Sequence, residues 1–139
     1  MTKKINPVFV LLIMLAAAVS LIGCREAAPP ISQDISAAEA HVLIQQSAAN
    51  PDFVILDVRT TEEYSSGHLE NAVLVDFNAE NFRGEVAKLA KDDTYLVYCR
   101  SGARSRSAAD VMAELGFQKV YNMQAGFNEW QAEGFPVVP

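Results

Sequence analysis

The segment TYLVYCRSGARS, residues 94–105, carries most of what this sequence says about its fold. Residues 94–98 have the composition of a strand, and this strand ends directly at Cys99. A loop of small residues follows, and a helix begins within it, because apolar side chains recur at helical spacing from 108 to 115. The segment therefore predicts a strand, a short loop and a helix, with Cys99 at the carboxyl end of the strand.

Short β-rich runs and helical stretches alternate on both sides of this segment. Further strands are expected at 53–56, 72–75 and 119–122. Helices are expected at 36–48, 61–64, 79–90 and around 127–130. Strands that alternate with helices indicate an α/β fold with a mainly parallel sheet covered on both faces. Sites in such sheets form where strands end and helices begin, which is the expected position of Cys99.

The first 23 residues have a different character from the rest of the chain. Two lysines, an apolar stretch at 8–21 and small residues at the end are the parts of a secretory signal, so residues 1–23 are expected to be removed. The sequence LIGC at 21–24 resembles the lipobox of bacterial lipoprotein precursors, which implies that Cys24 becomes a lipidated first residue. An uncleaved apolar helix with an incidental cysteine is the alternative, although the stretch is short for a membrane span.

These assignments divide the chain into a signal peptide (1–23), a proline-containing tether (24–34) and one domain (35–139). The lipid would anchor the domain to a membrane of the cell envelope, facing the periplasm or the exterior. The residue after Cys24 is Arg25. An aspartate at this position would resemble an inner-membrane retention signal, so its absence favours the outer membrane. The net charge of −6 becomes −8 once the two signal lysines are removed, and such an acidic protein is not expected to bind nucleic acid.

Cys99 is the only thiol left if Cys24 carries lipid. Exported proteins usually use cysteines in disulfide pairs, so an unpaired one needs a chemical reason. Free N–H groups at the start of a helix, a glycine turn and two arginines, Arg100 and Arg104, all favour a thiolate, and the pKa of Cys99 is expected below its ordinary value. A buried structural cysteine is the alternative, which this electropositive setting disfavours.

Three separated motifs resemble the single-domain rhodaneses, the thiosulfate sulfurtransferases. They are CRSGARS at 99–105, DVR at 57–59 with EY at 63–64 and GHL at 67–69, and a C-terminal pattern of Gly126, Trp130, Gly134 and Pro136. The likeness covers about residues 36–138. It implies a parallel five-stranded sheet with helices on both faces, and a cycle in which sulfur passes from thiosulfate to cyanide or a thiol through a cysteine persulfide.

The same resemblance implies the roles of individual residues. Cys99 would be the nucleophile, and the anion-binding loop would consist of Arg100, Ser101, Gly102, Ala103 and Arg104. Asp57 and Arg59 would lie beside the loop, where an ion pair that supports it and a direct substrate contact both stay open. His68 is expected to make a structural hydrogen bond. A monomer without cofactor is expected, and no cluster of ligands at metal spacing is visible.

Three other functions compete with sulfur transfer. Phosphatases and arsenate reductases of related folds use a Cys-x5-Arg loop, whereas the interval from Cys99 to Arg104 is Cys-x4-Arg and Ser105 stands at the arginine position. A non-catalytic interaction or sulfur-carrier module is the second alternative, although such modules commonly lose the cysteine. A disulfide-handling protein is the third, and it would need a second thiol to resolve a mixed disulfide.

Overall fold

A computed structural model describes residues 31–139, so the predicted signal peptide, Cys24 and most of the predicted tether lie outside the described residues. The elements, in chain order, are β1 (Ile31–Ile35), α2 (Ala37–Ser47), β2 (Phe53–Asp57), α3 (Thr61–Ser65), β3 (Val73–Leu74), α4 (Phe82–Val86), β4 (Thr94–Tyr98), α5 (Ala103–Glu114), β5 (Lys119–Met123) and α6 (Gly126–Ala132). No helix within 31–139 is long and apolar enough to cross a membrane.

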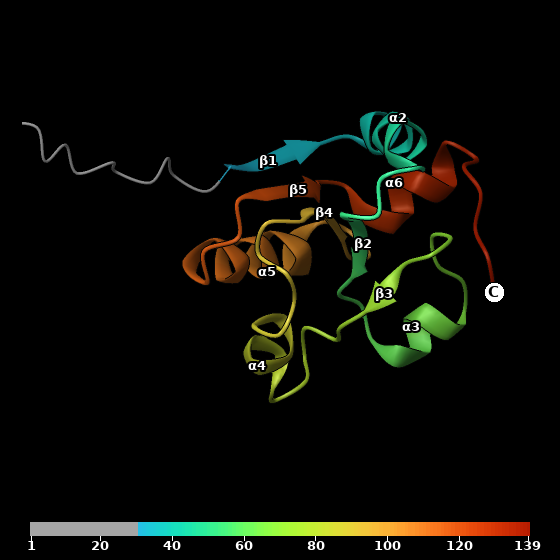
Figure 1. Cartoon of the computed structure of the whole chain (residues 1–139). Helices are drawn as coiled ribbons and strands as arrows, with labels where there is room; N and C mark the ends of the chain where they lie inside the picture. The colour runs from blue at the N-terminus through green and yellow to red at the C-terminus, as the bar shows by residue number, and fades with distance from the viewer. Residues whose placement is uncertain (1–30) are drawn as a thin grey trace, which may run out of the picture.

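The five strands form one parallel sheet in the order β1-β5-β4-β2-β3 (Figure 1). β4 occupies the centre, where it pairs with β2 from Phe53 to Asp57 and with β5 from Lys119 to Asn122. A central strand of a parallel sheet is covered on both faces, which explains the buried run from Tyr95 to Tyr98. The predicted α/β class, with a five-stranded parallel sheet and flanking helices, is confirmed.

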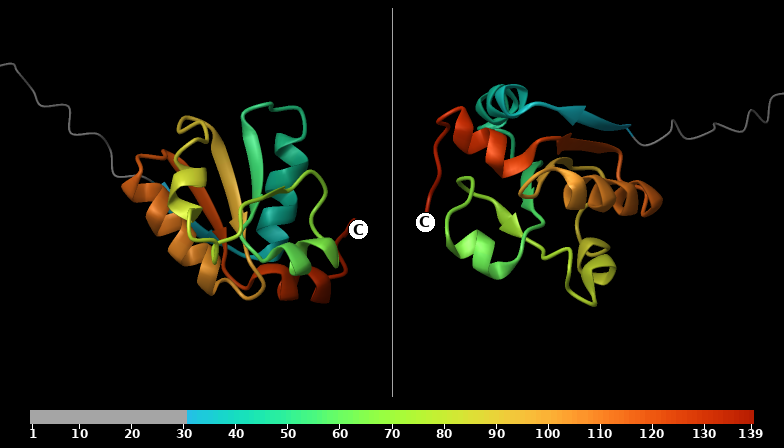
Figure 2. Two further views of the ribbon diagram at one scale, coloured as in Figure 1. Left: turned by 90° about the horizontal axis from the view of Figure 1, so that it is seen from below. Right: turned by 180° about the vertical axis from the view of Figure 1, so that it is seen from behind.

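Helices α4 and α5 cover one face of the sheet, and α2 and α6 cover the other (Figure 2). Alternate residues of β4 divide between the two faces, since Tyr95 and Val97 pack under α5 while Leu96 and Tyr98 pack under α6. This alternation follows from the two-residue period of a strand. It also directs Cys99, the next residue after β4, toward the face that α5 covers.

The N-terminal boundary of the domain differs from the sequence prediction, which assigned residues 24–34 to the tether. Ile31–Ile35 forms β1, which pairs along its whole length with β5. Three of its five residues, Ser32, Gln33 and Asp34, are polar. A strand at the edge of a sheet can carry polar residues, because it needs less apolar surface than a central strand. The strand therefore lacks the apolar pattern that identified the other four.

The helix predicted at 79–90 is also shorter than expected. Only Phe82–Val86 is helical, and turns close both ends through bonds from Phe82 N–H to the carbonyl of Ala79 and from Leu89 N–H to the carbonyl of Val86, both 3.0 Å. Gly84 in the middle lowers helix propensity, and Asn81 at the N-cap makes no side-chain capping bond. Phe82 and Val86 still pack into the core as the periodicity predicted.

Candidate active site

Cys99 follows the last residue of the central strand, and two neighbouring elements fix the backbone there. Val58 N–H, at the end of β2, donates to the carbonyl of Tyr98 at 3.0 Å. Phe127 N–H, at the start of α6, donates to the carbonyl of Cys99 at 2.8 Å. The Cys99 side chain is only 1% exposed. The position of its sulfur is therefore set by three elements that converge at the carboxyl edge of the sheet.

Gly102 brings the loop close to this sulfur. Its backbone has a φ of 94°, in the left-handed region that side chains disfavour, and its N–H donates to Cys99 Sγ at 3.1 Å. A Cβ on this residue would lie 1.7 Å from the carbonyl oxygen of Gln124. Only glycine allows the loop to turn here and to present its N–H to the sulfur.

Hydrogen-bond donors surround the sulfur and favour its anionic form. Burial raises the pKa of the Cys99 thiol, but the Ser105 hydroxyl and the backbone N–H groups of Ser105, Ser101 and Gly102 outweigh burial and hold the pKa below its ordinary value. Ser105 Oγ lies 3.5 Å from Sγ and 3.1 Å from the carbonyl of Gly102, so these two acceptors share one hydroxyl hydrogen. A thiolate, carrying full charge, is the stronger acceptor.

The predicted loop thus contacts the sulfur only in part. Within the described residues, the backbone N–H groups of Arg100, Ala103 and Arg104 make no hydrogen bond to Sγ. Ser105, which the sequence analysis considered only as the place where a phosphatase would have arginine, supplies a donor instead. It lies in the first turn of α5 and is fully buried.

The two arginines of the loop have different surroundings. Arg104 makes a bidentate ion pair with Glu63 of α3, in which Nη1 donates to Oε2 at 2.8 Å and Nη2 donates to Oε1 at 2.9 Å. Hydrogen bonds from Arg104, together with Thr60 N–H, outweigh partial burial and lower the pKa of Glu63 to about 2. Arg100 is exposed, and no carboxylate within residues 31–139 pairs with it. Arg100 is therefore the arginine of this loop whose charge is free to act on a substrate.

Asp57 and Arg59 form a buried ion pair beside the loop, with 2.6 Å between Arg59 Nη2 and Asp57 Oδ2. The Tyr98 hydroxyl donates to Asp57 at 2.5 Å, and Arg59 also donates to the carbonyl of Gly67 at 2.8 Å. The Arg59 guanidinium lies 4.0 Å from the ring centre of Phe127. Because Asp57 is fully buried and Arg59 is 2% exposed, this arrangement suits support of the loop better than substrate contact.

His68 has the structural hydrogen bond that was expected of it. Its Nδ1 lies 3.1 Å from the carbonyl of Tyr64, and its ring stacks on the Tyr64 ring with 3.7 Å between centres. Its backbone exchanges two hydrogen bonds with Val138. These contacts tie the C-terminal segment to the end of α3 and leave the imidazole no contact with the sulfur site.

A polar cleft of about 300 Å³ opens beside the loop. Arg59, Glu63 and Ser66 line it on the side of α3. Arg100, Phe127, Asn128 and Gln131 line it on the side of the loop and of α6. The cleft therefore gives a small molecule access to the rim of the loop that carries Cys99.

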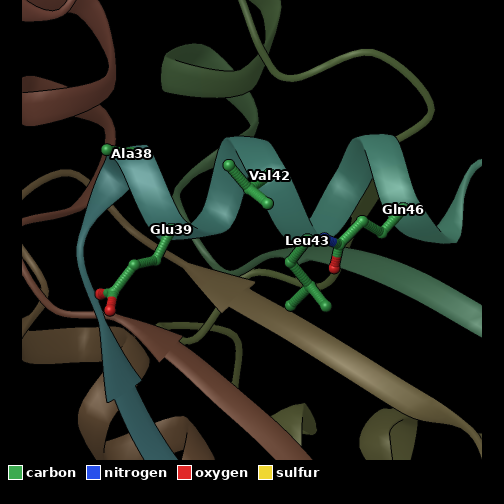
Figure 3. Close-up of a pocket in the computed structure, with 5 residues that line it drawn as sticks. All are labelled: Ala38, Glu39, Val42, Leu43 and Gln46. Atoms are coloured by element: carbon green, nitrogen blue, oxygen red, sulfur yellow. The ribbon is translucent and has the colours of Figure 1, made fainter.

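A second depression, of about 320 Å³, lies over the outer face of α2 (Figure 3). Leu43 and the exposed Val42 contribute its apolar surface. Glu39 is its one ionisable lining residue, and its carboxylate accepts hydrogen bonds from Ser36 in the helix cap. This depression therefore offers no group for sulfur chemistry.

The described residues bear on metal binding but not on the predicted lipidation. No group of three or more His, Cys, Asp or Glu residues within 31–139 is placed to hold a metal ion. Cys99 is the free cysteine of this part. Cys24, the predicted lipidation site, lies outside the described residues.

Comparison with known proteins identifies relatives of this chain. The model of the rhodanese-like domain family matches residues 36–133. A protein from Allochromatium vinosum named "Sulfurtransferase" is 30% identical over 100 residues, which are 72% of this chain and 92% of that protein. A tRNA uridine(34) hydroxylase from Cronobacter sakazakii is 32% identical over 120 residues, but the chain spans only 33% of its length.

Solved structures show the same fold. A rhodanese-related protein from Thermoplasma volcanium superposes with a TM-score of 0.62 at 27% identity, covering 76% of this chain and 97% of that one. A protein from M. tuberculosis superposes with a TM-score of 0.66 at 26% identity, covering 78% of this chain and 98% of that one.

Proposed function

The chain belongs to the rhodanese-like family of sulfurtransferases, and we propose that it moves sulfane sulfur from thiosulfate, or a similar donor, to a thiol or cyanide through a persulfide on Cys99. The observation that carries the proposal is the hydrogen bond from Gly102 N–H to Sγ at 3.1 Å, with Ser105 Oγ as a further donor. A buried thiol surrounded by donors is set up to ionise and attack without a separate general base.

The cycle consists of two balanced displacements. The Cys99 thiolate attacks the outer sulfur of thiosulfate, a sulfur–sulfur bond to Cys99 forms, the original sulfur–sulfur bond breaks, and sulfite leaves with its electron pair. An acceptor thiolate or cyanide then attacks the outer sulfur of the persulfide and takes it, and the electron pair returns to Cys99. Neither step needs an oxidant or a reductant. The donors around Sγ would hold the anion in both states.

The surroundings of the loop speak against a phosphatase. In that chemistry a free guanidinium would face the bound phosphate, whereas Arg104 is held by Glu63. The residue one position further is Ser105, whose hydroxyl lies at the sulfur. The tRNA hydroxylases are about three times as long as the matched region, so their activity is not transferred to this chain.

We further propose that the protein is exported and lipid-anchored, with residues 1–23 as its signal peptide and Cys24 as its acylated first residue. Of the two membranes, we propose the outer one as the location of the anchor. The sequence LIGC at 21–24 supports this. Cys24→Ser should release the protein from the membrane fraction or stall its processing. A Cys24→Ser variant that stays membrane-bound with a normally shortened chain would contradict the anchor.

Turnover of thiosulfate and cyanide tests the sulfurtransferase proposal. The wild type should form thiocyanate and sulfite in equal amounts. Cys99→Ser keeps the size of the buried side chain but lacks the sulfur that forms a persulfide, so it should fold with an unchanged circular dichroism spectrum and show no turnover. Thiocyanate formation by a folded Cys99→Ser variant at the wild-type rate would exclude the proposed nucleophile.

A further inference from the structure

The cleft beside the loop has a net positive character that comes from Arg100. Two other lining residues carry charge, but each is already paired. Arg59 is bound to Asp57, and Glu63 is bound to Arg104. Each pair is neutral as a unit, so Arg100 supplies the unbalanced charge.

The remaining polar groups of the cleft suit a small oxygen-rich ligand. Asn128 and Gln131 contribute side-chain amides from the exposed face of α6. Amides donate hydrogen bonds to carboxylate oxygens, and a guanidinium binds a carboxylate through two parallel bonds. A volume of about 300 Å³ lies at the small end of the range for ligand sites.

The wall of the cleft is joined directly to the backbone of the nucleophile. Phe127 N–H donates to the carbonyl of Cys99 at 2.8 Å, and Asn128 N–H donates to the carbonyl of Arg100 at 3.0 Å. A Cβ on Gly126 would lie 2.4 Å from the same Cys99 carbonyl, so α6 and the loop are in close contact. A molecule in the cleft therefore lies beside Arg100, the neighbour of Cys99 in the chain, and against the start of α6, which binds the backbone of Cys99.

We propose that this cleft binds the sulfur acceptor, and that the acceptor is a small thiol bearing a carboxylate, which Arg100 binds. The inference rests on the proposed sulfur transfer through Cys99. The acceptor thiolate attacks the outer sulfur of the Cys99 persulfide, its new sulfur–sulfur bond forms, the bond to Cys99 breaks, and Cys99 recovers its thiolate. One persulfide anion replaces another, so the charges balance.

Discharge of the preformed persulfide separates acceptor binding from the loading step. The protein is loaded with thiosulfate, freed of excess reagent, and mixed with 3-mercaptopropionate, 2-mercaptoethanol or cysteamine at equal thiolate concentration. Loss of the added sulfur is followed by rapid quench and intact mass. The wild type should discharge fastest to the anionic thiol and slowest to the cationic one.

Two variants alter the charge of the cleft. Arg100→Gln should lower the ratio of discharge rates between 3-mercaptopropionate and 2-mercaptoethanol about fivefold. Asn128→Asp adds a negative charge in the first turn of α6, where an acidic side chain suits the helix dipole, and should shift the preference toward cysteamine. Arg83→Gln is the matched control, because Arg83 pairs with Glu114 at the far end of α5 and its loss should leave the ratio unchanged.

The possible outcomes separate this inference from the function beneath it. A wild type that never gains sulfur would overturn both. A persulfide that forms but discharges without regard to thiol charge, or an Arg100→Gln variant that slows all three thiols equally, would overturn the acceptor cleft alone. If Arg83→Gln lowered the ratio of discharge rates as much as Arg100→Gln does, the preference would come from the overall charge of the protein. This result would also reject a role for Arg100 in the cleft.

Discussion

Two strand-to-helix junctions of this molecule differ in what binds the backbone N–H groups at the start of the helix, which have no partner within the helix itself. At the start of α2, Ser36 and Glu39 form a reciprocal capping box, in which each side chain accepts a hydrogen bond from the backbone N–H of the other residue. At the start of α5, Gly102 occupies the N-cap without a side-chain capping bond. Its N–H donates to the sulfur of Cys99 instead. Where a helix closes its own N-terminus the junction is structural, and where it stays open the donors become available for chemistry.

The largest effect should come from closing the open junction, through Gly102→Ala. The Cβ would meet the Gln124 carbonyl at 1.7 Å in a left-handed conformation, so we expect a cost of about 3 kcal/mol and loss of sulfur transfer. Gly116→Ala is the matched control, because its φ of 88° has similar strain while nothing lies within 4 Å. Urea unfolding and thiocyanate formation are the measurements. Equal activity in both variants would show that the open junction is not needed.

Ser105→Ala removes one donor and leaves the backbone of the junction intact. The lost hydroxyl bond lowered the pKa of Cys99, so the pKa should rise and the thiolate fraction at neutral pH should fall. We expect activity at pH 7 to decrease about tenfold, as for one hydrogen bond to a charged group. Ser107→Ala on the exposed side of the same helix should change nothing. The readout is the pH dependence of iodoacetamide alkylation, and identical profiles for wild type and Ser105→Ala would refute the role of this hydroxyl.

Glu63→Gln tests a third junction, at the start of α3, where one side chain both caps the helix and binds the loop that carries Cys99. Glu63 caps α3 with Thr60 and also holds Arg104 of the loop. The pKa of Glu63 falls from 4.5 to about 2 on folding, so its contribution is complete above pH 4.5 and is lost as the pH falls through about 2. We expect Glu63→Gln to lower the free energy of unfolding by about 1 kcal/mol at pH 7, and this difference from the wild type should shrink below pH 4.5.

Unfolding of Glu63→Gln by urea at several pH values measures this contribution. Glu85→Gln is the control, since Glu85 of α4 pairs with Lys88 just beyond that helix, on an exposed surface, and its removal should leave the stability near the wild-type value. A stability difference between wild type and Glu63→Gln that stays constant from pH 7 to pH 2 would contradict the assigned ion pair.

The smallest effect on activity should come from opening the closed junction. Ser36→Ala removes the N-cap of α2 and should cost about 1 kcal/mol in the free energy of unfolding. Its activity should equal that of the wild type, because α2 lies across the sheet from α5. Chemical denaturation and the turnover assay check both statements. A large loss of activity in Ser36→Ala would remove the contrast between the two junctions.

The open junction was predictable from sequence because its signals are local. A β-rich run, a cysteine and a glycine within one segment indicated a strand, a turn and a helix start at residues 94–105, and the structure has β4 and α5 there. The periodicity of 108–115 also located the buried face of α5, including Ala108 and Met112. These features depend on neighbours in the chain, which the sequence displays directly.

The features that were not predicted depend on distant contacts. Glu63 and Arg104 are 41 residues apart, and nothing local indicates that α3 lies against the loop. The approach of Ser105 to the sulfur depends on the rotation of α5 relative to the turn at Gly102. β1 was missed because an edge strand that pairs with β5 on one side can carry polar residues.

The mass of the intact protein tests the central claim most directly. After thiosulfate treatment, the described domain should gain the mass of one sulfur atom, and cyanide should remove it again. Cys99→Ala should neither gain nor lose this mass. A wild type that gains no sulfur from any donor, or a Cys99→Ala variant that gains it as the wild type does, would contradict the assignment of the persulfide to the open junction at Cys99.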